Sequence, residues 1–204
     1  FFFKIENILM KVVRRILVPI AHGCEEIEAM TIVGTFRRAE ANVTIGKVYQ
    51  DGEDNSDLNV LMSRGVKLVA DFGISENTLD ENYDAIILPG GIKGAENFSK
   101  NETFISILKN HFNQGRLLAA ICASPALVLE PHGFLEEKDA TAYPALVEKL
   151  SNQSKASERV VLSDNLITGN GPGSSLEFCL AIVEALYDEE KVKELAKNMV
   201  IKDY

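Results

Sequence analysis

The sequence has no tryptophan, and its 204 residues contain only three cysteines and three histidines. The cysteines are far apart and form no CxxC pair, which argues against a disulfide framework and against a structural zinc site. The histidines show no metal-ligand spacing, so we expect solvated or capping roles for them. These absences predict a protein without a metal or any other cofactor, in a reducing compartment, most simply the cytosol. The residues concerned are Cys24, Cys122, Cys179, His22, His111 and His132.

Two further absences exclude classes of function. No apolar run is long enough to span a bilayer, and no run of lysine and arginine stands out in a chain whose formal net charge is -9. Binding to nucleic acid or to an anionic membrane depends on clustered positive charge, so we expect neither. Residues 1–9 are apolar but interrupted by charges, unlike the core of a signal peptide. We expect residues 1–13 to be an N-terminal extension and residues 14–204 to form one domain.

What the sequence does contain is an alternation of strand and helix patterns. Apolar, β-rich segments predict strands at residues 15–20, 42–48, 83–88 and 117–121, and helical spacing is found at 25–39, 102–112, 174–186 and 189–200. Residues 160–168 predict a hairpin around a Ser-Asp-Asn turn. Fully apolar strands between helices are typical of a parallel sheet covered on both faces. The predicted fold is therefore a single-domain α/β sandwich of the flavodoxin-like type.

The apolar run at residues 117–121 ends in Cys122, and small residues and Pro125 follow. This pattern predicts a buried strand that turns sharply into a helix at the edge of the sheet where sites form. Backbone N–H groups and a helix N-terminus at such a bend favour a thiolate. From the residue type alone, the alternative is an inert core cysteine, which we expect Cys179 to be. Cys24 precedes acidic residues that raise a thiol pKa, so it is a candidate for oxidation but not for nucleophilic attack.

Acidic residues open the predicted helix at residues 25–39. Their ordinary role is to complement the helix dipole. Glu25 and Glu28 share one face, however, and we place Glu28 beside Ile27 and Met30 on the apolar side of the helix, which also includes Ile32, Val33 and Phe36. A partly buried carboxyl group near a thiol has a raised pKa and can transfer a proton. Glu28 is therefore a candidate partner for Cys122.

Two glycine-rich segments follow predicted strands. Gly90 and Gly91 end the strand at residues 83–88, and their N–H groups either stabilise an oxyanion or belong to a plain tight turn. The absence of Gly-Lys-Ser/Thr excludes a phosphate loop. The second segment, which contains Gly171 and Pro172, is either a rigid turn before a helix capped by Ser174 or a wall of the active pocket.

Four segments form a pattern along the chain: 24–28 (CEEIE), 87–91 (ILPGG), 119–125 (AAICASP) and 171–178 (GPGSSLEF). In this order and at this spacing they resemble the DJ-1 family of Parkinsonism-associated deglycases, within the PfpI superfamily. The resemblance runs from about Arg14 to Tyr187. It implies a homodimer of flavodoxin-like subunits.

The resemblance also implies roles for individual residues. Cys122 is implied to be the nucleophile and the oxidation-sensitive thiol, with Glu28 as the protonated carboxyl group that hydrogen-bonds it. The turn of Gly90 and Gly91, together with the backbone amide of Ala123, is implied to form an anion pocket. Arg64 matches an interface arginine that reaches toward the partner's site, and Arg38 is a second candidate for that role; the plain alternative for both is solvated surface charge.

The sequence departs from the family pattern at three positions. Some members carry a histidine near the thiol where this chain has Tyr143, which can donate a hydrogen bond but cannot act as a base at neutral pH. The proteolytic branch has histidine directly after the cysteine, where this chain has Ala123, so a protease triad is not expected. Ser124 replaces a glycine of several members and adds a hydroxyl beside the thiol.

These residues predict a cofactor-independent glyoxalase or deglycase. Cys122 would attack small 2-oxoaldehydes such as methylglyoxal, and related chemistry would remove early glycation adducts, in the service of an oxidative-stress response. The alternative is a redox sensor without enzymatic activity, in which Cys122 is oxidised to a sulfinate and the dimer acts as a chaperone or signalling partner. A biosynthetic or amidotransferase activity has no support from individual residues.

Overall fold

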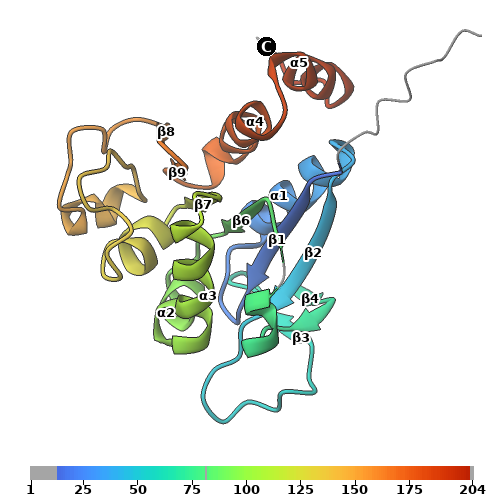
Figure 1. Ribbon diagram of the computed structural model, residues 1–204, viewed down its shortest axis with the longest axis vertical. Helices are drawn as coiled ribbons and strands as arrows, with labels where there is room; N and C mark the ends of the chain where they lie inside the picture. Colours follow the sequence, from blue (N-terminus) through green and yellow to red (C-terminus); the bar gives the residue numbers. More distant parts are fainter. Residues whose placement is uncertain (1–12, 81, 203–204) are drawn as a thin grey trace, which may run out of the picture.

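A seven-stranded sheet runs through the computed structural model, which describes residues 13–80 and 82–202 (Figure 1). The strand order is β5-β2-β1-β6-β7-β9-β8. All neighbouring strands are parallel except β8, which pairs antiparallel with β9. The strands are β1 (Arg15–Ile20), β2 (Asn42–Lys47), β5 (Phe72–Gly73), β6 (Ala85–Leu88), β7 (Leu117–Ile121), β8 (Val160–Ser163) and β9 (Leu166–Gly169). The predicted α/β fold with a mostly parallel sheet is confirmed, while the predicted extension at residues 1–13 lies almost wholly outside the described residues.

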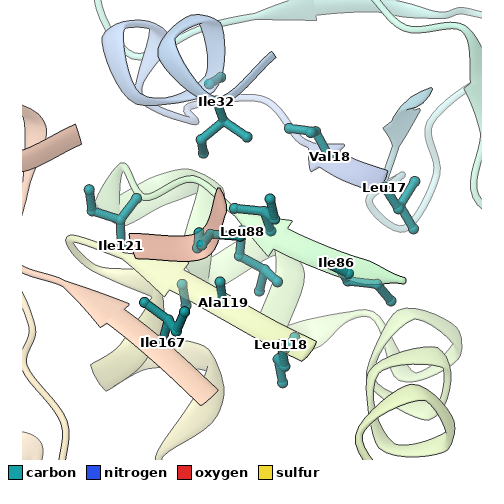
Figure 2. Packing of buried hydrophobic residues seen from close by; sticks show 14 of the residues in the cluster. Leu17, Val18, Ile32, Ile86, Leu88, Leu118, Ala119, Ile121 and Ile167 are labelled. Carbon is teal, nitrogen blue, oxygen red and sulfur yellow. The ribbon is translucent and has the colours of Figure 1, made fainter. Parts of the chain in front are cut away.

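The four central strands are built from apolar residues that are buried on both faces, as a parallel sheet between helix layers requires. The strand register aligns Leu17, Ile86, Leu118 and Leu166 in one row. Successive side chains point to opposite faces of a strand. Figure 2 accordingly shows Val18 facing Ile32 of the first helix, whereas Leu118 points away from that helix. The core thus continues through the sheet, which makes the strand ends a rigid platform.

Five α-helices and a small hairpin surround this sheet among the described residues: α1 (Glu26–Arg38), α2 (Ile92–Lys100), α3 (Glu102–Asn113), α4 (Ser175–Leu186), α5 (Glu189–Asn198), β3 (Asn59–Leu61) and β4 (Lys67–Val69). Helix α1 packs against α4 and against β1 and β2, and α4 also packs against β7, β8 and β9. Helix α3 packs against β7 and against α2, and α5 packs on α4. Shorter helical turns cover Glu76–Asp80, Pro125–Leu129, Pro144–Lys149 and Pro172–Ser174.

The structure corrects the predicted apolar side of the first helix. Ile27 is 57% exposed and Met30 is 45% exposed, although both are apolar. The buried stripe consists of Ala29, Ile32 and Phe36, which recur at the spacing of three to four residues that one helix face requires. Glu28 is nevertheless buried, because it lies beside that stripe and points to the end of the sheet.

Other sequence-based expectations also need correction. Ser174 precedes α4, but its hydroxyl makes no capping bond; it donates to Asn170 Oδ1 at 2.8 Å and to the Gly171 carbonyl at 2.9 Å. His111 is buried, neither solvated nor capping, and its Nε2 lies 2.8 Å from the Leu117 carbonyl oxygen. Burial lowers the pKa of His111 to about 4 and keeps the ring neutral. Helix α2 was not predicted, because glycines open it.

Membrane-spanning helices and clusters of metal ligands are both absent from the described residues. None of the helices there combines the length and the apolarity that a membrane crossing requires. Nor do His, Cys, Asp and Glu side chains gather anywhere in residues 13–80 or 82–202 in a group of three that could hold a metal ion.

Candidate active site

Cys122 occupies a sharp turn immediately after β7. Its φ angle is 64°, a left-handed conformation that costs a residue with a side chain about 1–3 kcal/mol. Neighbouring loops hold it there: the Cys122 N–H donates to the Gly169 carbonyl at 2.8 Å, and its carbonyl accepts from the Tyr143 N–H at 2.7 Å. The residue is 7% exposed. The geometry therefore presents an almost buried thiol at the carboxyl edge of the sheet, in a sharp turn like those that hold the nucleophile of α/β-hydrolases.

Glu28, in the first turn of α1, is fully buried beneath this turn. Its Oε2 accepts a hydrogen bond of 2.6 Å from the Gly90 N–H. Its Oε1 is buried and makes no hydrogen bond of standard geometry, although the Cys122 thiol is close enough to influence the carboxyl group. Burial raises the pKa of Glu28 to about 7, against the lowering effect of the Gly90 amide. A carboxyl group of this kind still carries its proton near neutral pH.

The thiol and the carboxyl group influence each other's protonation. Burial, and after it the charge of Glu28, raises the pKa of Cys122 to about 12, whereas the backbone amides of Gly91 and Ala123 act to lower it. The expectation of a resting thiolate therefore does not hold while Glu28 is ionised. Because two negative charges cannot be held so close together in a buried site, the pair carries at most one. When Glu28 takes the proton, the sulfur is left facing the two amides.

The glycines after β6 allow this close assembly. A Cβ atom on Gly90 would lie 2.5 Å from Cys122 Cβ, so a larger residue would displace the thiol. Gly91 has a φ angle of 86°, and a Cβ there would lie 2.3 Å from the Gly23 carbonyl oxygen. Gly90 differs from its expected role, because its N–H is already donated to Glu28. Of the three residues expected in the anion pocket, Gly91 and Ala123 are those whose amides face the sulfur.

Cys122 forms part of the floor of a cavity of about 760 Å³. Tyr143 and Pro172 line this cavity, as does Arg64 from the turn of the β3–β4 hairpin. Gly171 lies behind Tyr143, since a Cβ on it would be 3.7 Å from Tyr143 Cδ2. Arg38 does not join them: it ends α1, is exposed, and donates to the Gly34 carbonyl of its own helix at 2.9 Å. Within one chain, the fold therefore brings together all the expected residues except Arg38.

Two cavity features were not expected from the sequence. His22 lines the cavity, and its Nδ1 accepts from the Leu61 N–H at 2.8 Å while its Nε2 lies 3.1 Å from Glu53 Oε1. Glu26 fixes the hairpin by accepting from the Ser63 hydroxyl at 2.8 Å and from the Arg64 N–H at 2.9 Å. Neither could be found by pattern, because both depend on a hairpin that folds back over the start of α1.

The thiols of Cys24 and Cys179 lie in the core and not at the Cys122 site. Cys24 and Cys179 are fully buried, and burial raises the pKa of each to about 12. Cys24 Sγ also accepts from the Ala21 N–H at 3.3 Å. The suggestion that Cys24 is a site of oxidation therefore has no support in its surroundings.

The family follows from a comparison with known proteins. The model of the DJ-1/PfpI family matches residues 14–185 of this chain. The chain belongs to the DJ-1/PfpI family. It is 48% identical over 187 residues to Protein DJ-1 homolog B of Arabidopsis thaliana, covering 92% of this chain and 41% of that protein. The chain thus spans less than half the length of the plant relatives that it matches.

Relatives of similar size to the chain are also found. A structure of Toxoplasma gondii DJ-1 described as oxidized superposes with a TM-score of 0.86 at 40% identity, over 93% of this chain and all (100%) of that one. The glutathione-independent glyoxalase DJR-1.2 of Caenorhabditis elegans is 32% identical over 144 residues, which cover 70% of this chain and 75% of that protein. The resemblance found in the sequence motifs is thereby confirmed at the level of the family, and the flavodoxin-like fold with it.

Proposed function

We propose that this chain is a cofactor-independent glyoxalase with related deglycase activity, acting on small 2-oxoaldehydes such as methylglyoxal. The observation that carries the proposal is the pairing of Cys122, held in a strained turn, with a buried carboxyl group, Glu28, whose pKa of about 7 lets it carry or release a proton at neutral pH. A family relative named as a glutathione-independent glyoxalase supports the same chemistry.

The first step is the attack of Cys122 on the aldehyde carbon. In the reactive form of the pair, Glu28 holds the shared proton and the sulfur is a thiolate facing the Gly91 and Ala123 amides. A bond forms between Sγ and the aldehyde carbon while the C=O π bond opens, so the oxygen becomes an alkoxide. Glu28 protonates this alkoxide and becomes a carboxylate, which completes a hemithioacetal.

The second step moves hydrogen within the bound substrate. The Glu28 carboxylate removes the proton from the former aldehyde carbon and returns a proton to the neighbouring carbon, through an enediol, while the proton of the first hydroxyl passes to the neighbouring oxygen and the first carbon regains its C=O bond. The result is a thioester of a 2-hydroxy acid. Water then attacks the thioester carbonyl, the C–S bond breaks, and the 2-hydroxy acid and the free thiol are released. For methylglyoxal, the sum is one aldehyde and one water converted to lactate. Hydrolysis of early glycation adducts on thiols and amines would use the same nucleophile.

The test is the consumption of methylglyoxal in the absence of glutathione. We expect the wild-type protein to form lactate, Cys122→Ala to form none, and Cys179→Ala to behave as the wild type, because the sulfur of Cys179 is fully buried. Turnover that survives in Cys122→Ala would refute the proposal, as would a folded wild-type protein without turnover.

A redox-sensing role is a second candidate, favoured by the amides around the sulfur. Gly91 and Ala123 would donate to the oxygens of a sulfinate, and a protonated Glu28 would donate to one of them. The structure of the Toxoplasma relative is described as oxidized. Intact-mass spectra after graded peroxide should show a gain of two oxygens confined to Cys122, and the lack of any such gain would exclude sensing. Chaperone or signalling activity of the dimer would be judged by comparing the oxidised and reduced protein.

We also propose that the chain forms a homodimer through α1 and the adjoining β3–β4 hairpin. The exposed apolar side chains of Ile27 and Met30 lie on α1, and Val69 is 66% exposed on the hairpin that Glu26 ties to the same helix. Arg64 would then contribute to the partner's cavity. Light scattering should show a dimer that Ile27→Asp dissociates. Leu162→Asp, a matched change at an exposed position on β8, should leave the dimer intact. A monomeric wild type would exclude this arrangement.

The cellular setting proposed is a reducing compartment, most simply the cytosol. All three cysteines are free in the structure; Cys24 and Cys179 are fully buried in the core, and Cys122 borders a cavity. A free, reactive thiol is retained more easily where glutathione keeps cysteines reduced. Fractionation of cells that express the protein would test the assignment.

A further inference from the structure

The hydroxyl group of Ser124 bonds to the turn that carries Gly90. Ser124 follows the strained Cys122–Ala123 turn after β7 and is fully buried. Its Oγ donates a hydrogen bond of 2.6 Å to the carbonyl oxygen of Pro89, which belongs to the turn after β6. The two turns that frame the thiol are therefore joined by a side chain as well as by packing.

The same peptide unit that accepts from Ser124 donates to Glu28. The Pro89 carbonyl and the Gly90 N–H belong to one planar peptide bond, which is trans, since no cis peptide bond occurs in the described residues. The oxygen and the hydrogen of a trans peptide point in opposite directions. One end of this unit is held by the Ser124 hydroxyl at 2.6 Å, and the other end contacts Glu28 Oε2 at 2.6 Å.

This connection matters because few groups hold the Glu28 carboxyl group. Its second oxygen, Oε1, makes no hydrogen bond of standard geometry, so apart from the nearby Cys122 thiol the Gly90 N–H is the group that orients the carboxyl group in its buried site. A hydrogen bond accepted by a peptide carbonyl also polarises the N–H at the other end of that peptide and makes it a stronger donor. The Pro89–Gly90 peptide thus gives Ser124 a route by which to act on Glu28 without touching it.

We propose that Ser124 is a positioning residue, which fixes the Pro89–Gly90 peptide and through it the carboxyl group of Glu28 against Cys122. The consequence for turnover rests on the proposed function, whereas the effect on Glu28 does not. The alternative is a purely structural role, in which the hydroxyl satisfies a buried carbonyl and affects stability alone.

The experiment measures the protonation of Glu28 directly. Near neutral pH exposed carboxyl groups are ionised, so the infrared carbonyl band of a protonated carboxylic acid that persists there belongs to a buried group. The loss of this band in Glu28→Gln would assign the band to Glu28. The wild-type band should disappear with a midpoint near pH 7. The ionisable groups that act on Glu28 are Cys122, Glu25 and Cys24, and a substitution at Ser124 changes none of them.

In Ser124→Ala we expect the midpoint to rise by about half to one pH unit, because a weakened Gly90 donor stabilises the carboxylate less. Ser124→Thr keeps a hydroxyl group at this position and should keep the wild-type midpoint. Ser174→Ala removes another buried serine hydroxyl, at a distance from this peptide, and should leave the midpoint unchanged. If Ser124→Ala does not fold, Ser124→Cys replaces it, with a smaller rise expected from the weaker thiol donor.

A folded Ser124→Ala protein with a lower melting temperature and an unchanged midpoint would overturn the proposal in favour of the structural role. The titration needs no substrate, so it remains decisive even if the protein has no glyoxalase activity. If that activity is found, Ser124→Ala should lower kcat and leave KM unchanged.

Discussion

The turn after β7 and the interior of α4 each hold a cysteine, and the two differ in a way that burial does not reveal. Cys122 is 7% exposed and Cys179 is fully buried, and the pKa of each is raised to about 12. For Cys179 the cause is burial, which is a permanent property of the core. For Cys122 a further cause is the charge of Glu28, which one proton removes, and two backbone amides act in the opposite direction.

The backbone around each thiol accounts for this difference. Cys179 sits within α4, where backbone N–H groups bond to carbonyls one turn earlier in the helix. Cys122 sits at a left-handed φ angle, in a turn where the Gly91 and Ala123 N–H groups face its sulfur.

Alkylation should separate the two thiols most strongly. We expect iodoacetamide to modify Cys122 at least about 10³-fold faster than Cys179, because Cys179 becomes accessible only when the surrounding structure opens. Mass spectrometry of peptides from the native protein would give both rates, with urea-unfolded protein as the control in which they converge. Equal rates in the native protein would remove the contrast.

The acidic partner should matter nearly as much as the thiol. Glu28→Gln is expected to lower kcat for methylglyoxal by about 10²–10⁴-fold, the range for loss of a general acid–base group. Glu26→Gln changes a neighbouring carboxylate on the same helix, whose pKa is lowered because its hydrogen bonds outweigh its burial. The variant should keep most of the activity. A similar loss in both variants would point to damage of α1 and not to catalysis.

Stability should depend on pH through Glu28. The pKa of this group is about 7 in the folded protein and near 4.5 in the unfolded chain, so the folded state binds more protons between these values. The contribution of Glu28 to the free energy of unfolding therefore falls by up to about 3 kcal/mol as pH rises through this window. Above the window this contribution stays constant. Urea unfolding at pH 5 and pH 8 should show this loss in the wild type but not in Glu28→Gln. An equal pH dependence in both proteins would contradict a raised pKa.

The smallest effect is expected at Tyr143, which contacts the Cys122 turn through its backbone N–H and not through its phenol group. Its N–H donates to the Cys122 carbonyl at 2.7 Å, a bond that Tyr143→Phe retains. We expect kcat/KM to change by about twofold or less. A much larger loss would show that the phenolic hydroxyl takes part in the reaction.

Much of this site could be predicted from the sequence, and the errors have physical causes. The bend at Cys122 was visible because an apolar run stops at small residues, and Glu28 was found through its place in the first turn of a helix. On the predicted apolar side of α1, Ile32 and Phe36 are buried as expected, whereas Ile27 and Met30 are exposed, because the helix turns a neighbouring face to the sheet. The Gly90 amide was expected to stabilise an anion, yet the fold commits it to Glu28.

Most of the strands and helices, and the residue types where strands end, follow from the sequence alone, because hydrophobic periodicity and turn-forming residues act locally along the chain. Only the tertiary structure decided which polar groups meet. The bonds from Ser124 to Pro89, from Gly90 to Glu28 and from Tyr143 to Cys122 each join segments that are distant in sequence. Their partners are selected by the parallel sheet, which brings the ends of β1, β6 and β7 to one edge.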